Sequence, residues 1–255
     1  MNRRFDGKIA VVTGAGDGIG RETALAFARE GAALAVVDIN GAAAAETIRM
    51  IEKESGKAIA IAADVTKSDQ VAATVERVVT TFGRLDILFN NAGLVDFSPL
   101  CELDESRFDA VMAVNAKGVW LGMKYAIPAM IKNGGGAIVN ACSASGLVAV
   151  KNCSAYVASK HAVAGLTKIA AIEYGTRGVR VNAVAPGATA TNMNKANMAR
   201  FSADEWETRM RTLYPGSGRL AEPREIAQCV LFLCSDAASF VNGAVLPVDG
   251  AYTAQ

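Results

Sequence analysis

Two side chains in the second half of the chain could together move a proton. Tyr156 and Lys160 are four residues apart in a helical pattern, so they share one face of that helix. A free tyrosine titrates near pH 10, and a neighbouring cation stabilises its phenolate and lowers that pKa. Such a tyrosine can take a proton from an alcohol while a hydride leaves for a cofactor. Taken alone, a Tyr and a Lys at this spacing are more often a solvated surface pair.

Ser143 and Asn115 are two further candidates for the same site. Ser143 directly follows a strand pattern at 137–141, and ligands of open α/β sheets bind at such strand ends. A hydroxyl there can stabilise charge that develops on a substrate oxygen, although a strand-end serine commonly only caps a loop. Asn115 lies inside a long helical pattern, where its amide competes for backbone hydrogen bonds. A local inconsistency of this kind can mark a functional site.

A glycine-rich segment near the N-terminus predicts a binding site for a phosphate group. Residues 13–20 read TGAGDGIG and stand between a strand pattern and a helical pattern. Glycines at such a junction let the backbone approach a pyrophosphate, whose charge is favoured by exposed N–H groups at the helix start. An ordinary tight turn is the alternative for the glycines alone, and the flanking strand and helix favour the nucleotide.

Acidic residues near this loop favour NAD over NADP. Asp38 ends the second strand pattern about 20 residues after the glycines, where an acid accepts hydrogen bonds from the adenosine ribose and repels a 2′-phosphate. No arginine follows it, because Ile39 and Asn40 come next. Asp17 adds a second negative charge inside the loop.

Two further strand ends complete the predicted nucleotide edge. Asp64 follows the third strand pattern and can hold the adenine amino group, although a helix cap at Thr66 or Ser68 is equally natural there. The fourth strand pattern runs into residues 90–93, NNAG, which suit a tight turn behind a cofactor.

The elements that must position these residues alternate along the chain. Apolar, β-branched runs predict strands at 8–13, 33–39, 58–63, 87–90, 137–141, 179–184 and 244–248. Helical patterns between them include 21–30, 68–82, 107–131, 156–174 and 223–235. This alternation predicts an α/β fold, a Rossmann-type doubly wound parallel sheet of about seven strands with helices on both faces. No linker interrupts residues 1–255, so we expect a single domain, with 189–218 as a segment that covers the substrate.

Composition excludes several other classes of protein. The 26 basic and 25 acidic residues are balanced without a basic block, which argues against nucleic acid. The first residues are polar and no apolar run could span a bilayer, so we expect no membrane partner and a cytoplasmic, soluble protein. Five cysteines without CxxC spacing favour free, packed thiols. The single histidine, His161, argues against a metal site, and against a Ser-His-Asp hydrolase unless it is itself the base.

The landmarks in combination closely resemble the short-chain dehydrogenase/reductase family. The match comprises TGAGDGIG, Asp38, Asp64-Val65, NNAG, Asn115, Ser143, Tyr156-x-x-x-Lys160, Pro186-Gly187, Val241-Asn242-Gly243 and Val248-Asp249-Gly250. The resemblance therefore covers essentially the whole chain. Cys142 stands where the family often has another serine, which leaves Ser143 as the member thirteen residues before Tyr156. Thr189 stands where an aliphatic residue is commoner, so the start of the cover is expected to meet the substrate differently.

The resemblance implies roles for these residues. Tyr156 would be the general acid/base, Ser143 would position the substrate oxygen, Lys160 would hold the nicotinamide ribose and lower the pKa of Tyr156, and Asn115 would anchor a water of the proton relay. Contacts with the nicotinamide cofactor are expected from Gly14, Asp17, Gly18, Ile19, Gly20, Asp38, Ile39, Asp64, Val65, Asn91, Ala92, Gly93, Tyr156, Lys160, Pro186, Gly187, Thr189 and Thr191.

The substrate is predicted only by class. Contacts are expected from Ser143, Ser145, Cys153 and Tyr156, with Val95, Gly187, Met193 and Met198 as further candidates. These side chains are small or apolar and offer no cationic clamp, which favours a small, uncharged secondary alcohol or ketone oxidised or reduced with NAD(H). An NAD-using epimerase or dehydratase, a non-catalytic NAD-binding regulator and an NADP-preferring reductase are the alternatives.

Assembly is also implied by the resemblance. The family is commonly tetrameric, built on the long helices that here start near Arg107 and Tyr156 and on the C-terminal strand region. Trp120, Leu121 and Met123 give the first of these helices more apolar positions than one buried face needs. We therefore expect a homo-oligomer, and a tetramer by resemblance.

Overall fold

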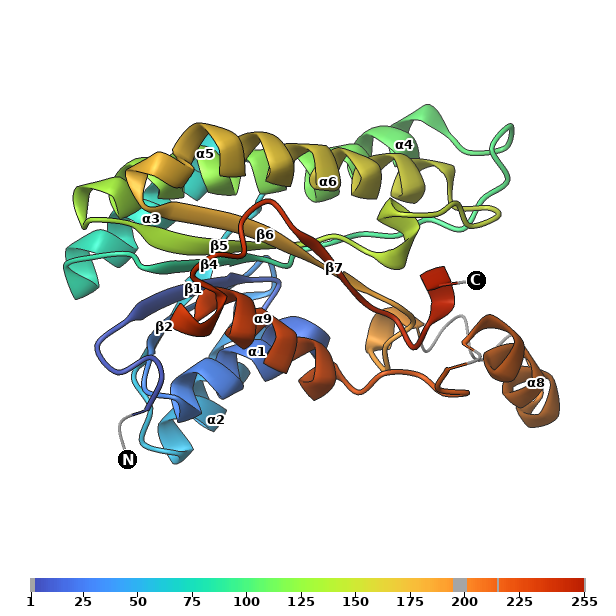
Figure 1. Cartoon of the computed structure of the whole chain (residues 1–255), viewed down its shortest axis with the longest axis horizontal. Coiled ribbons are helices and arrows are strands. Elements are labelled where there is room, and N and C mark those ends of the chain that lie inside the picture. The colour runs from blue at the N-terminus through green and yellow to red at the C-terminus, as the bar shows by residue number, and fades with distance from the viewer. Residues whose placement is uncertain (1–2, 195–200, 215, 255) are drawn as a thin grey trace.

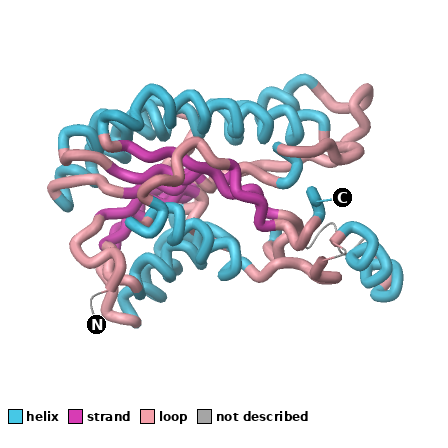
Figure 2. The backbone as a smooth tube through the Cα atoms, viewed as in Figure 1, coloured by secondary structure: helices cyan, strands magenta, loops and turns pink. Residues whose placement is uncertain are grey.

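One parallel sheet organises the part of the chain that the structure, a computed structural model, describes: residues 3–194, 201–214 and 216–254. Within these residues seven strands lie in the order β3-β2-β1-β4-β5-β6-β7, and every neighbouring pair is parallel. The strands gather in the middle of the molecule, with helices on either side of them (Figure 2). The strands are β1 (Ile9–Thr13), β2 (Ala33–Asp38), β3 (Ala58–Ala62), β4 (Ile87–Asn90), β5 (Gly136–Ala141), β6 (Val179–Pro186) and β7 (Val245–Val248).

Helices cover both faces of this sheet (Figure 1). On one face lie α1 (Gly18–Arg29), α2 (Gly41–Lys53) and α9 (Pro223–Cys234). On the other lie α3 (Ser68–Phe82), α4 (Glu105–Met112), α5 (Gly118–Lys132) and α6 (Ser154–Tyr174). The helix α8 (Ala203–Leu213) packs on neither face and lies beyond the carboxyl ends of the strands. The predicted doubly wound α/β fold is thereby confirmed.

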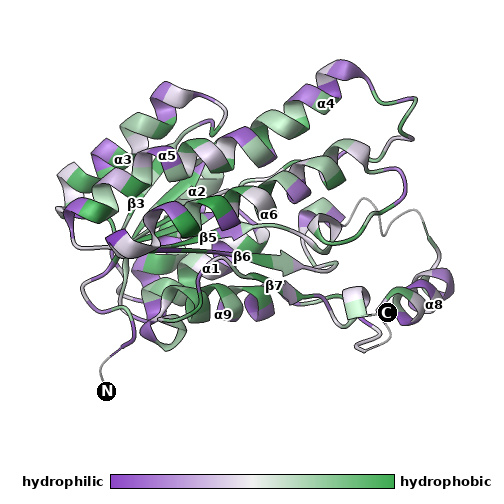
Figure 3. Cartoon of the chain, turned by 45° about the horizontal axis from the view of Figure 1, so that its top comes forward, coloured by the Kyte–Doolittle hydropathy of each residue, from purple (hydrophilic) through white to green (hydrophobic). Residues whose placement is uncertain are grey.

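Two apolar layers hold the helices against the sheet. One contains Phe27, Phe89 and Leu231, and the other contains Leu85, Met130 and Ile138. β1 and β4 have almost only buried residues because both of their faces are covered, which explains their continuous apolar runs. Colouring by hydropathy shows the same arrangement, with hydrophobic residues toward the sheet and hydrophilic residues on the outer sides of the helices (Figure 3).

The position of the site follows from the strand order. β1 pairs with β2 on one side and with β4 on the other, so the chain winds away from β1 in two directions. The connections that follow β1 and β4 lead to helices on opposite faces of the sheet and leave a crevice at its carboxyl edge, where open α/β folds bind ligands.

Four elements differ from the sequence-based expectation in an informative way. The helix expected over 107–131 is interrupted by a π-helical turn, Ala113–Lys117, which separates α4 from α5. The helices α2 and α8 were missing from the predicted set, although Asn40 caps α2 and Ser202 forms a capping box with Glu205 at α8. β6 runs to Pro186, two residues beyond the predicted end, and a proline, which has no backbone N–H to donate to the sheet, is tolerated at the end of a strand.

Several structural details bear on the excluded classes. In the described ranges no helix is long and apolar enough to cross a membrane, and no group of His, Cys, Asp and Glu could hold a metal ion. All five cysteines are free, but Cys101 is exposed instead of packed as expected. His161 is exposed on α6, and its Nδ1 lies 2.9 Å from the carbonyl oxygen of Val157.

Candidate active site

The glycine-rich loop packs its backbone directly against the loop after β4. Gly14 has φ +61°, and a Cβ on it would lie 2.8 Å from Cα of Ala92, so only glycine is accommodated there. A Cβ on Gly20 would collide with the carbonyl oxygen of Gly14 and with the amide of Asn91. Asp17 is the N-cap of α1, but its side chain caps no backbone N–H. The first N–H groups of α1 thus lack a side-chain partner, which is what a bound pyrophosphate requires.

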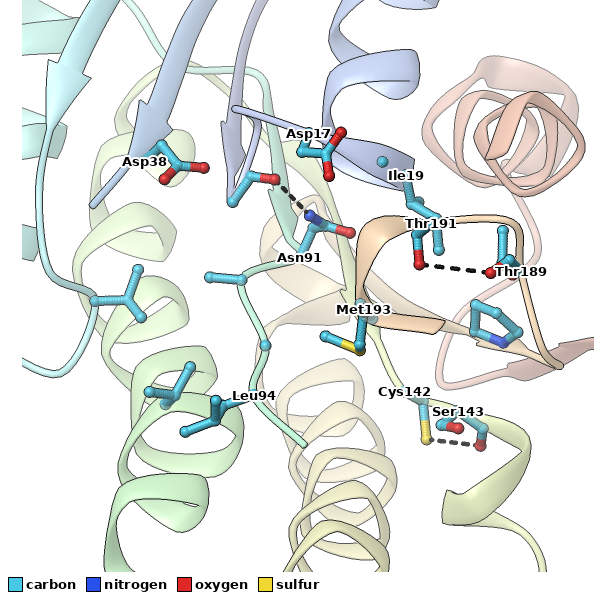
Figure 4. A pocket seen from close by; sticks show the side chains of 18 of the residues that line it. Asp17, Ile19, Asp38, Asn91, Leu94, Cys142, Ser143, Thr189, Thr191 and Met193 are labelled. Atoms are coloured by element: carbon cyan, nitrogen blue, oxygen red, sulfur yellow. Dashed lines mark hydrogen bonds between the residues drawn. The ribbon is translucent and has the colours of Figure 1, made fainter. Parts of the chain in front are cut away.

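A cavity of about 450 Å³ starts at this loop and follows the carboxyl edge of the sheet. Figure 4 looks into it, with Asp38 and Asp17 toward one end, Cys142 and Ser143 toward the other, and Asn91 and Met193 between them. Every residue predicted to contact the cofactor lines this cavity except Gly20, which serves the packing of the loop. Lining residues that were absent from the predicted cofactor set are Val37, Ala63, Leu94, Val114, Ala141, Cys142, Ser143, Met193 and Asn194.

Asp38 is held in place by backbone groups at the end of β2. Its Oδ2 accepts the N–H of Gly16 at 2.8 Å, and its Oδ1 accepts the N–H of Asn40 at 2.9 Å. The guanidinium of Arg21 binds the carbonyl oxygen of Gly16 and donates to the hydroxyl of Thr47 at 3.1 Å. A carboxylate oxygen accepts more than one hydrogen bond, so Asp38 retains capacity for the hydroxyls of a ribose.

The other two strand ends have mainly structural contacts. Asp64 accepts both the N–H and the hydroxyl of Thr66, and these bonds with the charge of Lys67 outweigh the effect of burial and lower the pKa of Asp64. The N-cap of α3 is Lys67, so neither Thr66 nor Ser68 caps that helix. The side-chain amide of Asn91 donates to the carbonyl oxygens of Thr13 and Gly14 at 3.0 Å each. Asn91 therefore ties the loop after β4 to the glycine-rich loop.

At the other end of the cavity, α6 presents Tyr156 and Lys160 side by side. The Nζ of Lys160 lies 5.5 Å from the centroid of the Tyr156 ring and donates to the carbonyl oxygen of Ala141 at 2.7 Å. Lys160 is 3% exposed, and its burial lowers its pKa to about 8. With this pKa Lys160 is mostly protonated at pH 7, so it places one positive charge beside the phenol of Tyr156.

The hydroxyl of Tyr156 is hydrogen-bonded to Ser143, which stands at the end of β5. Burial raises the pKa of Tyr156 to about 12, and the hydrogen bond with Ser143 acts in the opposite direction without overcoming it. This differs from the expected lowering by Lys160, because in the chain by itself desolvation of the phenolate is the larger effect. Tyr156 is therefore a neutral phenol at pH 7 in the absence of another cation.

Asn115 does not line the cavity. It is fully buried in the π-helical turn, where its amide donates to the carbonyl oxygen of Leu94 at 2.8 Å and to the hydroxyl of Ser159 at 3.0 Å. Its Oδ1 accepts the N–H of Leu94 at 2.8 Å. The side chain thus joins α4–α5, the loop after β4 and α6, and both of its amide hydrogens are already in use.

A second cavity of about 170 Å³ adjoins the first at Ser143, Tyr156, Pro186, Gly187, Met193 and Asn194. All four predicted substrate contacts line it, as do Val95, Gly187 and Met193, whereas Met198 lies outside the described residues. One wall of the second cavity was not predicted from the sequence. It consists of Phe97, Trp206, Arg209, Met210, Leu213, Tyr214 and Tyr252.

The described part of the segment 189–218 runs over both cavities. Thr189 is 2% exposed, and it pairs with Ala221 instead of reaching the second cavity. Asn192 donates to Oδ2 of Asp17 at 2.5 Å, which joins this segment to the glycine-rich loop. α8 then forms a wall of the second cavity. The capping box at its start was a usable signal for the helix, but nothing local indicates that it faces Tyr156.

The whole chain has counterparts among known proteins. Residues 14–253 match the family model described as enoyl-(acyl carrier protein) reductase. Cyclohexanol dehydrogenase from Acinetobacter sp. strain SE19 is 44% identical over 256 residues, which cover 100% of this chain and 98% of the relative. The chain belongs to the short-chain dehydrogenase/reductase family. It is thus an oxidoreductase, and the sequence-based assignment is confirmed.

Other members of this short-chain dehydrogenase/reductase family are similarly close. Cis-4-hydroxycyclohexanecarboxylate dehydrogenase from Sinomonas cyclohexanicum is 44% identical over 255 residues, covering 100% of both chains. The crystal structure of levodione reductase has a TM-score of 0.94 at 37% identity and covers 98% of this chain and 99% of its own. Solved relatives contain NADH in one case and NADP in another, so membership indicates a nicotinamide cofactor without choosing between the two.

Proposed function

We propose that this protein is an NAD(H)-dependent dehydrogenase of a small, ring-sized secondary alcohol, or the reductase of the corresponding ketone. The observation that carries the proposal is the position of Ser143 and Tyr156, which line both the long cavity along the sheet edge and the smaller cavity beside it. A cofactor in the first cavity and an alcohol in the second would meet at these two hydroxyls.

The first cavity suits a nicotinamide dinucleotide. The bare N-terminus of α1 would receive the pyrophosphate, and Asp38 would accept the ribose hydroxyls. Asp38 and Asp17 put two carboxylates at the adenosine end, where a 2′-phosphate would be repelled. Within the described lining no arginine or lysine stands at that end, since Lys160 belongs to the opposite one. These charges support NAD in preference to NADP.

The residues at the junction can then divide the chemistry of an alcohol. When bound, the nicotinamide accepts a hydride from the carbinol carbon or returns it. Ser143 holds the substrate oxygen, and Tyr156 removes the hydroxyl proton in oxidation or supplies it in reduction. Lys160 keeps a positive charge beside the phenol and so favours the phenolate once burial is offset by a further cation. The proton and the hydride together account for the two hydrogens lost by the alcohol.

Asn115 acts as a positioning residue in this proposal. Its amide fixes Leu94 and Ser159, and the π-turn around it releases a backbone carbonyl from the regular helical ladder. A water in a proton relay would be anchored by such a carbonyl and not by the Asn115 amide, whose hydrogens are used elsewhere.

The second cavity supports a compact substrate that is uncharged around the reacting carbon. Its volume of about 170 Å³ is below the roughly 300–1,000 Å³ of sites for drug-sized ligands. Near Tyr156 its walls are small or apolar, with Ser145, Cys153 and Val150. Cyclohexanol dehydrogenase and levodione reductase, both similar to this chain, are named for cyclic compounds. A cyclic secondary alcohol therefore combines the size and the polarity that the cavity offers.

We also propose that the chain is one domain and that it forms a homo-oligomer, with a tetramer as the expected order. Of the three apolar residues first considered, Leu121 and Met123 are core residues and only Trp120 is exposed, at 44%. Phe108, Ile169 and Ile172 on α4 and α6 are exposed as well and support burial of these helices by another copy.

Replacement of Tyr156 by phenylalanine tests the reaction. In Tyr156→Phe the ring and the cavity remain while the group that takes the hydroxyl proton is lost, so kcat for alcohol oxidation should fall by about 10²–10⁴-fold. His161→Gln is the matched control, because it changes an exposed residue of the same helix outside both cavities. Turnover of Tyr156→Phe within a few fold of the parent, with NADH bound normally, would refute the proposed role of Tyr156.

A further inference from the structure

The wall of the second cavity opposite Ser143 carries a positive charge. Arg209 belongs to α8 and lines this cavity together with Trp206, Met210 and Tyr214. The other lining residues named above are uncharged, so Arg209 stands out in a small and mostly apolar space. The residues expected from the sequence to contact the substrate did not include this side of the cavity, formed by α8.

Arg209 is exposed, and several other arginines of the chain have carboxylate partners. Arg107 binds Asp96 at 3.0 Å, Arg211 binds Glu207 at 2.7 Å, and Arg219 binds Glu225 at 2.7 Å. Among the described residues Arg209 forms no such ion pair. Arg211, two positions away on the same helix, is paired with Glu207 of that helix, so α8 provides a carboxylate for Arg211.

Arg209 is nevertheless held in a defined place. Its guanidinium carbon lies over the Phe201 ring, 5.0 Å from the centroid, and Phe201 in turn lies against Trp206 with 5.9 Å between ring centroids. Stacking uses the face of a guanidinium and leaves its N–H edges free, which are the groups that bind a carboxylate in bidentate fashion. Burial raises the pKa of Tyr214, and the charge of Arg209 acts in the opposite direction, so that charge is felt inside the cavity.

We propose that Arg209 forms an anion subsite at the α8 end of the substrate cavity, for ring-sized secondary alcohols that carry a carboxylate remote from the hydroxyl. The inference rests on the proposed function for the placement of the hydroxyl at Ser143 and Tyr156. The reacting end of such a substrate is uncharged, in agreement with the walls around Tyr156. Its carboxylate supplies the partner that the chain provides for Arg211 and does not provide for Arg209.

A substrate series with one varied group tests the subsite. The compounds are 4-hydroxycyclohexanecarboxylate, its methyl ester and cyclohexanol, assayed with NAD⁺ at low ionic strength. We expect kcat/KM for the carboxylate to exceed that for the ester by about tenfold, mainly through KM, because a charge-assisted pair is lost in the ester. The advantage should shrink as salt is raised.

Variants on α8 assign this preference to one side chain. Arg209→Gln should abolish the preference for the carboxylate over the ester, whereas Arg209→Lys should retain part of this preference because the charge remains. Arg211→Gln is the control, because it removes a charge from the same helix outside the cavity and should keep the preference. A parent protein that favours the ester, or equal effects of Arg209→Gln and Arg211→Gln, would overturn the subsite.

A binding measurement separates this inference from the proposed function. Cyclohexanecarboxylate, which has no hydroxyl to oxidise, is titrated by calorimetry into the parent and into Arg209→Gln, each saturated with NADH. Binding that depends on Arg209 supports the subsite even if no alcohol is turned over. Turnover of alcohols with carboxylate binding independent of Arg209 refutes the subsite and leaves the proposed function standing.

Discussion

The two walls of the substrate cavity are built in different ways. Ser143 follows the end of β5, and Tyr156 and Lys160 stand on α6, so all three depend on the sheet and on the helical layer packed on it. Trp206, Arg209 and Met210 stand on α8, which lies beyond the sheet edge. In the proposed reaction, the groups within hydrogen-bond reach of the reacting atom would belong to the sheet and its helical layer, and the groups that select the substrate would belong to the helix outside the sheet. On this proposal, substitutions on α8 change substrate preference without removing the groups that carry the chemistry.

The largest effect that sharpens this comparison is expected at Ser143. Ser143→Ala removes the hydroxyl that contacts Tyr156 and leaves the strand end intact, so kcat should fall by about 10²–10³-fold with all alcohols alike. Steady-state kinetics on a neutral and an anionic alcohol measure it. A loss of kcat that differs between the neutral and the anionic alcohol would show that Ser143 also selects the substrate, contrary to the proposed separation of chemistry and substrate selection.

The pH dependence should differ between the two directions of the reaction. Because burial raises the pKa of Tyr156 to about 12, the phenol is protonated at neutral pH and ready to donate in ketone reduction. Oxidation needs the phenolate, whose fraction rises about tenfold per pH unit below the pKa. We therefore expect kcat/KM for oxidation to increase with pH up to the pKa that Tyr156 has in the cofactor complex. For reduction, kcat/KM should be constant near neutral pH and should fall above that pKa. Parallel profiles in both directions would contradict this assignment of the proton.

The smallest effect on cofactor binding is expected at the contact between Asn192 and Asp17, which joins the segment 189–194 to the glycine-rich loop. Asn192→Ala removes the exposed hydrogen bond to Asp17 and should weaken NADH binding by about two- to fivefold, since exposed contacts of this type contribute little. Fluorescence titration with NADH measures this change in Kd. An unchanged Kd would show that the cover and the cofactor loop are independent, and a loss above about tenfold would make the cover part of the cofactor site.

Most of the wall formed by the sheet and its helical layer could be predicted from the sequence because its signals are local or follow from strand order. The glycine-rich turn, Asp38, Ser143 and Tyr156 each occupy a strand end or a helix start, and parallel strands bring these ends to one edge. Helix α8 has a capping box of its own, yet its position over Tyr156 depends on long-range packing that no periodicity reports. Arg209 and Tyr214 were missed for this reason.

Two of the expectations that the structure changed have one physical origin. The pKa of Tyr156 is raised in the chain alone, not lowered as expected, because burial, which a sequence does not display, is the largest influence on it. Asn115 was correctly singled out as a misfit in its helix, but its amide turned out to fix Leu94 and Ser159 from behind the cavity. Both cases depend on how completely a polar group is enclosed.

Oxidation of a ring-sized secondary alcohol with NAD can be measured by following the absorbance of reduced nicotinamide for a panel of cyclic alcohols, with NAD⁺ and NADP⁺ side by side, in the parent and in Asp38→Ala. We expect turnover of cyclic secondary alcohols and a kcat/KM at least about tenfold higher with NAD⁺ than with NADP⁺. This ratio should narrow in Asp38→Ala through a higher KM for NAD⁺. Faster turnover with NADP⁺, or no reduced nicotinamide from any alcohol, would contradict the proposed function.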